Sequence, residues 1–134
     1  MTASAIRDRA RGADALRFWL GADALVTGVN AVGYLVLAGW LDDWLGGDTS
    51  LYRAVGAGLL VFALGVAALA GARRPNVLGA WLVVAVNAGW VVASLVVALA
   101  DIGDFDTVGR VWIIAQAIVV AALATAQAAA LRRG

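Results

Sequence analysis

Four long apolar stretches follow one another along the chain, separated by short polar segments. They cover residues 18–40, 53–72, 76–100 and 108–130. Each is close to the ~20 residues that an α-helix needs to cross about 30 Å of hydrocarbon. A water-soluble bundle would need a charged outer face on every helix, and these stretches are almost free of charge. The pattern predicts an all-α membrane protein with one four-helix transmembrane domain over residues 1–134.

The segment before the first stretch, residues 1–14, alternates Arg and Asp. We expect it to form either an amphipathic helix on the cytoplasmic surface or a frayed tail. The apolar stretch that follows is longer than the roughly 7–15 apolar residues of a signal peptide. We therefore expect this first helix to be retained in the membrane.

The placement of charge predicts the orientation of the helices. The ends that would share one side of the membrane carry eight Arg residues: Arg7, Arg9, Arg11, Arg17, Arg73, Arg74, Arg132 and Arg133. The two loops on the other side carry six Asp residues: Asp42, Asp43, Asp48, Asp101, Asp104 and Asp106. Cytoplasmic loops of membrane proteins are enriched in Lys and Arg. The pattern predicts a multi-pass protein of the bacterial cell membrane, with both termini in the cytoplasm.

An internal repeat emerges when the chain is shifted against itself by 57 positions. The shift aligns Arg17 with Arg74, Asn30 with Asn87, and Arg53 with Arg110. Matches of Asn and Arg are uncommon by chance in a chain so rich in Ala, Val and Leu. The shift indicates tandem duplication of a helical hairpin, a 2+2 arrangement in which the two copies share one orientation.

Polar side chains inside the apolar stretches are the candidates for a binding site. They recur every three or four residues, which places them on one face of a helix. The candidate ligand-binding residues are Asn30, Tyr34, Asn87, Trp90, Trp112 and Gln116. Buried polar groups at membrane depth must find partners, because lipid supplies none. Two interpretations are open, and they can hold together. In one, Asn30 and Asn87 hydrogen-bond across the bundle and hold it together; in the other, the amides and aromatic rings line a cavity for a small, largely apolar molecule.

Asp23 is the one acidic residue placed well within an apolar stretch. Intramembrane acids usually have a function. Desolvation favours the neutral form of a carboxyl group, so coupling of ion transport to Asp23 is one hypothesis. The alternative is structural: Asp23 pairs with Arg17, Arg73 or Arg74, or accepts a hydrogen bond from Thr27.

The two Asp-rich loops share a pattern in which an Asp precedes an Arg at the start of the next helix. Asp48 precedes Arg53, and Asp106 precedes Arg110. Asp at a helix start accepts hydrogen bonds from free backbone N–H groups and suits the helix dipole. We expect these Asp residues to cap the helices and to form structural ion pairs with the two Arg residues.

The amino-acid composition excludes several kinds of chemistry. The chain contains no His, Cys, Glu or Lys, so it has none of the imidazole, thiol and amine groups that most catalytic and metal sites use. No phosphate-binding Gly loop or metal-ligand spacing occurs. We expect no enzyme activity, no cofactor, no metal and no nucleic-acid partner.

Three sequence strings carry a resemblance. They are residues 23–30 (DALVTGVN), residues 86–90 (VNAGW) followed by Ser94, and Val111-Trp112 leading to Gln116. The chain resembles small four-helix integral membrane proteins of actinobacterial type, and in size it is similar to DoxX-type proteins. The resemblance implies a four-span topology and no particular activity, substrate or catalytic residue.

These observations favour a small membrane protein that binds a small hydrophobic ligand, a lipid or a partner helix at a centre of Asn and aromatic residues. The alternative is a small transporter or channel that works as an oligomer and is coupled through Asp23. The expected partners are the lipid bilayer, a small apolar ligand or another membrane protein, and further copies of the chain.

Overall fold

The computed structural model describes residues 2–133, except for the side chains of Asp8, Arg9 and Ala10. The sequence expectations for Met1, and for the side chain of Arg9, lie outside the described residues. The described chain is helical, with five α-helices: α1 (Ala3–Val36), α2 (Ala38–Leu45), α3 (Thr49–Gly71), α4 (Val77–Leu99) and α5 (Thr107–Arg133). The four long helices, α1, α3, α4 and α5, are each long and apolar enough to cross a membrane. The all-α membrane class is therefore supported by the structure.

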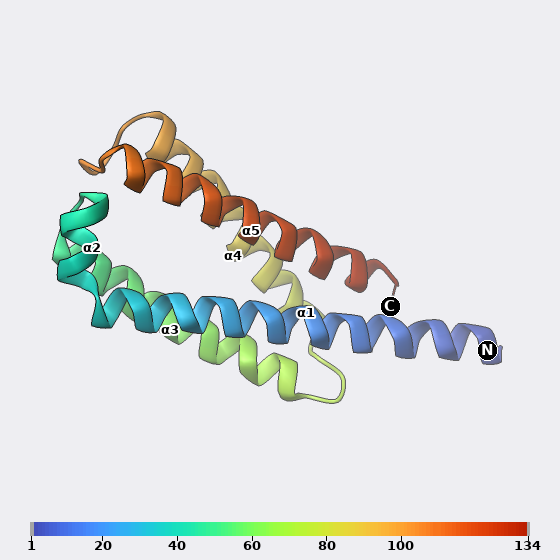
Figure 1. The fold of residues 1–134 in the computed structure, drawn as a ribbon. Helices are drawn as coiled ribbons and strands as arrows, with labels where there is room; N and C mark the ends of the chain where they lie inside the picture. Colours follow the sequence, from blue (N-terminus) through green and yellow to red (C-terminus); the bar gives the residue numbers. More distant parts are fainter. Residues whose placement is uncertain (1, 134) are drawn as a thin grey trace.

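Helix α1 is longer than a single membrane span, with 34 residues. It begins at Ala3, where the Thr2 hydroxyl accepts a hydrogen bond from the Ala5 N–H. Its first turns extend beyond the ends of the other helices (Figure 1). Residues 3–14 are thus the beginning of α1, rather than a separate surface helix or a frayed tail.

The expected first span, residues 18–40, is wrong at its far end. Helix α1 stops at Val36, and after Leu37 the chain continues as the short helix α2, which turns toward α5 (Figure 1). This turn lets α2 pack on α3 and α5 and bury Ala38 and Leu45. Hydropathy alone does not distinguish a straight helix from one that bends to bury two apolar side chains.

The long helices form two hairpins. The first hairpin is α1 with α3, and the second is α4 with α5; the helices within each hairpin pack extensively. Between the hairpins, α1 packs on α5, whereas α3 and α4 barely touch. The hairpins lie close together near the C-terminus and diverge toward α2 (Figure 1). The molecule is therefore a wedge.

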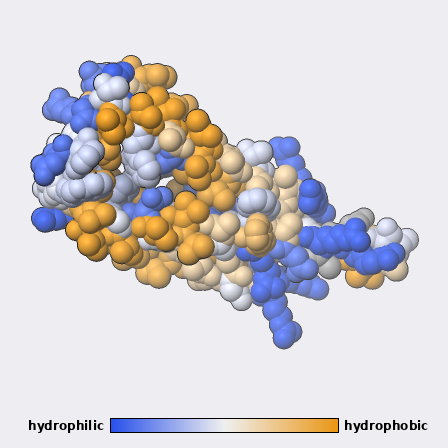
Figure 2. Space-filling view, viewed as in Figure 1, coloured by the Kyte–Doolittle hydropathy of each residue, from blue (hydrophilic) through white to orange (hydrophobic). Residues whose placement is uncertain are grey.

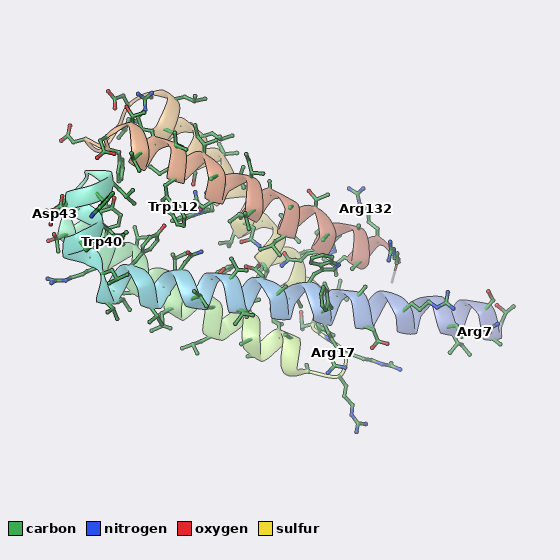
Figure 3. The ribbon with its side chains drawn as sticks, in the orientation of Figure 1. Arg7, Arg17, Trp40, Asp43, Trp112 and Arg132 are labelled. Carbon is green, nitrogen blue, oxygen red and sulfur yellow. The ribbon has the colours of Figure 1, made fainter. Side chains whose placement is uncertain are left out.

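The narrow end of the wedge holds the main hydrophobic core. All four long helices contribute to it, with Leu16, Leu20, Val66, Ala80, Val83 and Ala130 buried. Labelled Arg residues lie toward this end and labelled Asp43 lies at the opposite end (Figure 3). We call them the Arg end and the Asp end. The space-filling surface is mostly apolar between two polar ends (Figure 2), as expected for a surface that faces lipid.

The Asp end is closed by a bridge between the two loops that connect the helices within each hairpin. The Gly47 N–H donates to the Asp104 carbonyl at 3.1 Å, and the Asp106 N–H donates to the Leu45 carbonyl at 3.0 Å. Gly46 takes a positive φ of 76°, and a Cβ there would lie 2.7 Å from the Asp104 carbonyl oxygen. Glycine, which has no Cβ, is the residue that adopts this backbone conformation and allows the Asp104 carbonyl to lie so close. We refer to these contacts as the loop bridge.

We expect Gly109→Ala to destabilise the protein by about 1–3 kcal/mol, the usual cost of overpacking. A Cβ at Gly109 would collide with the Leu45 carbonyl oxygen, which accepts one of the hydrogen bonds of the loop bridge. Thermal unfolding in detergent measures the change. The control is Gly65→Ala in α3, where a Cβ has open space and Ala favours the helix. Equal melting temperatures for the two variants would contradict the prediction.

Candidate functional site

Four buried polar side chains meet on the Arg-end side of the bundle. Asp23 is 1% exposed, and its carboxylate accepts hydrogen bonds from the Thr27 hydroxyl at 2.9 Å, the Asn87 amide at 2.7 Å and the Gln127 amide at 2.8 Å. Asn87 also donates to the Gln127 side-chain oxygen at 3.2 Å. We call Asp23, Thr27, Asn87 and Gln127 the Asp23 cluster. It ties α1 to both helices of the second hairpin.

One of the contacts expected for Asp23, the hydrogen bond from Thr27, is confirmed. Thr27, one turn further along α1, donates to Asp23. Arg17, a candidate ion-pair partner, instead donates from its Nε to the Ala70 carbonyl oxygen at 3.4 Å. Three neutral donors surround the buried carboxyl group and occupy three of its roughly four acceptor positions.

The expected hydrogen bond between Asn30 and Asn87 is absent from the described structure. Asn87 is 4% exposed, and its amide N–H groups donate hydrogen bonds to Asp23 and Gln127. A carboxylate oxygen is a stronger acceptor than an amide oxygen, which explains why Asn87 bonds to Asp23. Asn30 is half-buried and makes no hydrogen bond to any described side chain. The two residues that the repeat aligns therefore have different surroundings.

Two adjoining cavities lie between the hairpins, on the Asp-end side of the Asp23 cluster. One has a volume of about 240 Å³ and the other about 230 Å³. Both are lined by residues of all four long helices, and they share Tyr34, Val55, Trp90 and Gln116. We call the two together the central cavity. Figure 2 shows the surface hollowed between α1 and α5 toward the wide end of the wedge.

The central cavity brings together all six candidate ligand-binding residues. Asn30 and Asn87 line the cavity nearer the Asp23 cluster, Trp112 lines the one nearer the loop bridge, and Tyr34, Trp90 and Gln116 line both. The remaining lining is almost entirely aliphatic and aromatic. A mainly apolar cavity with a few convergent polar groups is the usual form of a small-molecule site.

Most polar groups on the cavity wall already have partners. The Trp90 indole N–H donates to the Gln116 oxygen at 2.7 Å, and the Gln116 amide donates to the Ser94 hydroxyl at 3.0 Å. The Trp112 indole N–H crosses the wedge from α5 and donates to the Tyr34 hydroxyl at 2.9 Å; Trp112 points from α5 toward α1 (Figure 3). These bonds fix the aromatic side chains in place.

The helix-capping role of the two loop Asp residues is confirmed. Asp48 accepts a hydrogen bond from the Ser50 N–H at 3.4 Å, and Asp106 accepts one from the Gly109 N–H at 2.8 Å. Arg110 donates from its Nε to the Ala98 carbonyl at 2.8 Å, which ties the start of α5 to the end of α4. Ion pairing of Arg53 and Arg110 with these Asp residues stays a prediction.

Gln127, Tyr52 and Phe105 belong to the site, although they are not among the six candidate ligand-binding residues. Gln127 is fully buried at 0% exposure in the Asp23 cluster. In the sequence, the feature that marks it is a polar side chain within an apolar stretch. Tyr52 and Phe105 line the cavity near the loop bridge, where their rings are 6.2 Å apart. Aromatic residues at span ends are usually interfacial anchors, so nothing in the sequence marked these two for the cavity.

In comparisons with known proteins, no family model, curated protein or solved structure matches the chain. The resemblance to small actinobacterial-type membrane proteins therefore stays a prediction. Within the described residues, no three acidic side chains gather in a way that could hold a metal ion.

We expect Asp23→Leu to destabilise the protein by about 3 kcal/mol or more. The substitution leaves the donors of Thr27, Asn87 and Gln127 without their shared acceptor, and each unsatisfied buried donor costs about 1–3 kcal/mol. Asp23→Asn keeps one acceptor oxygen and should cost less. Thermal unfolding in detergent gives the order of stability.

The matched control is Asp14→Leu, at an exposed position of the same helix α1. It removes the same charge without breaking a hydrogen bond of the described structure, so its melting temperature should stay close to that of the wild type. A similar loss of stability in both variants would show that charge near α1, rather than the cluster, is what matters.

Proposed function

We propose that this protein binds a small, largely apolar molecule within the membrane, in the central cavity between its two hairpins. The observation that carries the proposal is the cavity itself, about 240 Å³ and 230 Å³ in its two adjoining parts. Small-molecule sites are typically apolar clefts of roughly 300–1,000 Å³ with a few well-placed polar groups. The two parts together reach this range.

The proposal includes an orientation in a bacterial cell membrane, with both termini in the cytoplasm. Arg7, Arg17 and Arg132 lie toward one end of the molecule and Asp43 at the other (Figure 3). This segregation agrees with the enrichment of Arg in cytoplasmic loops. The central cavity then lies in the outer half of the bilayer and the Asp23 cluster nearer the inner surface.

We further propose that the two hairpins arose by duplication. A shift of 57 residues lays the second half of α1 over α4 and lays α3 over α5. The pairing of helices supports this, since α1 packs on α3 as α4 packs on α5. The short helix α2 breaks the symmetry because only the first hairpin has it.

Binding is favoured over transport by the place of Asp23. The central cavity is lined by neither Asp23 nor any other charged residue, and the Asp23 carboxylate is enclosed by three donors from the protein itself. A coupling residue must exchange protons or ions with a pathway. The geometry supports a structural role for Asp23 and leaves the transporter as the second hypothesis.

We expect Val55→Trp to abolish ligand binding by filling the cavity. Val55 lies on α3 and lines both parts. The measurement is native mass spectrometry of protein gently extracted from its own membrane, which records any retained small molecule. The control is Val61→Trp, the same substitution on the same helix at a side chain that is 72% exposed. It should retain the molecule at the wild-type ratio.

Two outcomes would contradict this proposal. A molecule retained equally by Val55→Trp and Val61→Trp would bind elsewhere on the protein. A wild-type protein that holds nothing, both on extraction and after incubation with a total lipid extract, would have no ligand of this class. Melting temperatures of both variants establish that the comparison is made between folded proteins.

The orientation is tested by cysteine labelling, because the chain has no cysteine of its own. Single cysteines replace the exposed residues Asp43 in α2 and Ser4 in α1. A maleimide that cannot cross membranes should label Asp43→Cys in spheroplasts, and Ser4→Cys only after the membrane is permeabilised. The reverse pattern would place both termini outside the cell.

A further inference from the structure

Two polar groups of α1 remain available on the wall of the central cavity. Asn30 makes no hydrogen bond to any described side chain, and the Tyr34 hydroxyl accepts from Trp112 but donates to no described residue. Both residues line the cavity part nearer the Asp23 cluster. Residues four apart lie one above the other on a helix face. They form one polar spot in an apolar cavity.

Both side chains of this spot can donate a hydrogen to the same ligand oxygen. The Asn30 amide offers two N–H groups and one oxygen, and the Tyr34 phenol offers one O–H. A carbonyl oxygen, with two lone pairs and no hydrogen, complements such a set. Leaving these donors without a partner at membrane depth is unfavourable, since lipid chains supply no acceptor.

The rest of the cavity restricts the ligand further. Among the described residues, no charged side chain lines either part, so an ionised ligand would lose its hydration without compensation. Trp90 and Trp112 are held by their hydrogen bonds to Gln116 and Tyr34, which gives the cavity fixed aromatic walls. Flat rings pack well against aromatic side chains. The walls suit a neutral ring compound.

We infer that the central cavity selects a neutral ring compound that carries a carbonyl oxygen, held by hydrogen bonds from Asn30 and Tyr34. The inference rests on the proposed function and names the class of ligand. Asn30 is then the specificity-determining residue, because its carboxamide is free of the protein's own hydrogen bonds. Asn87, its counterpart in the repeat, is already engaged in the Asp23 cluster.

A matched pair of probes tests the inference. The first probe is 1-tetralone, a neutral two-ring ketone, and the second is tetralin, the same ring system without the carbonyl. Equilibrium dialysis against micelles of the same detergent gives both dissociation constants. We expect the wild type to bind 1-tetralone about tenfold more tightly, the effect of one or two good hydrogen bonds. The infrared carbonyl band of bound 1-tetralone should also shift to lower wavenumber.

The variant Asn30→Leu has the same branched shape and no hydrogen-bonding group. It should lose most of the preference for 1-tetralone, because only the Tyr34 O–H remains as a donor. Because the Asn30 amide joins no helices in the described structure, we expect the variant to fold, and Asn30→Ala provides a second test. A tenfold preference that persists in these variants would overturn the role of Asn30.

The outcomes separate this inference from the proposed function. If the wild type binds both probes equally and Val55→Trp binds neither, the cavity is a ligand site without carbonyl selectivity, and only the inference fails. Tighter binding of the alcohol 1-tetralol than of 1-tetralone also overturns it. If the wild type binds neither probe and holds no molecule in native mass spectrometry, the proposed function fails with it.

Discussion

The arrangement of the helices depends on one buried carboxylate. Helices α3 and α4 barely touch, so the two hairpins must be joined elsewhere, and at the Arg end Asp23 does so by accepting hydrogen bonds from both α4 and α5. In lipid, apolar side chains gain little by packing on one another rather than on acyl chains. Hydrogen bonds between helices therefore determine which helices meet and in what register.

The central cavity is a consequence of joining the hairpins at two separate places. The Asp23 cluster and the core beside it hold the Arg end, and the loop bridge holds the Asp end. Between them the hairpins diverge, and among the described residues only the hydrogen bond from Trp112 to Tyr34 crosses this space from α5 to α1. The central cavity occupies the space between the two joints.

Much of the fold could be predicted from the sequence, because membrane spans are defined by length and hydropathy. The ends of α4 and α5 lie close to the expected ones, and the polar side chains on single helix faces do meet around one cavity. The turn at Leu37 could not be predicted, since it depends on contacts of α2 with other helices. The hydrogen-bond partners of Asn87 could not be predicted either, because they depend on the rotation of each helix about its own axis.

Asn30 and Asn87, which the shift of 57 residues aligns, differ in their hydrogen bonding. Asp23 and Gln127 align with Ala80 and Ala70 under the same shift that aligns the two Asn residues. The first hairpin thus carries an acid, and the second hairpin a buried amide, that the other hairpin lacks at the aligned position, and both side chains bond to Asn87. The other Asn is left facing the cavity. Asp23 and Gln127 together bond to Asn87 and join the two hairpins, whereas the Asn30 carboxamide makes no hydrogen bond to a described side chain.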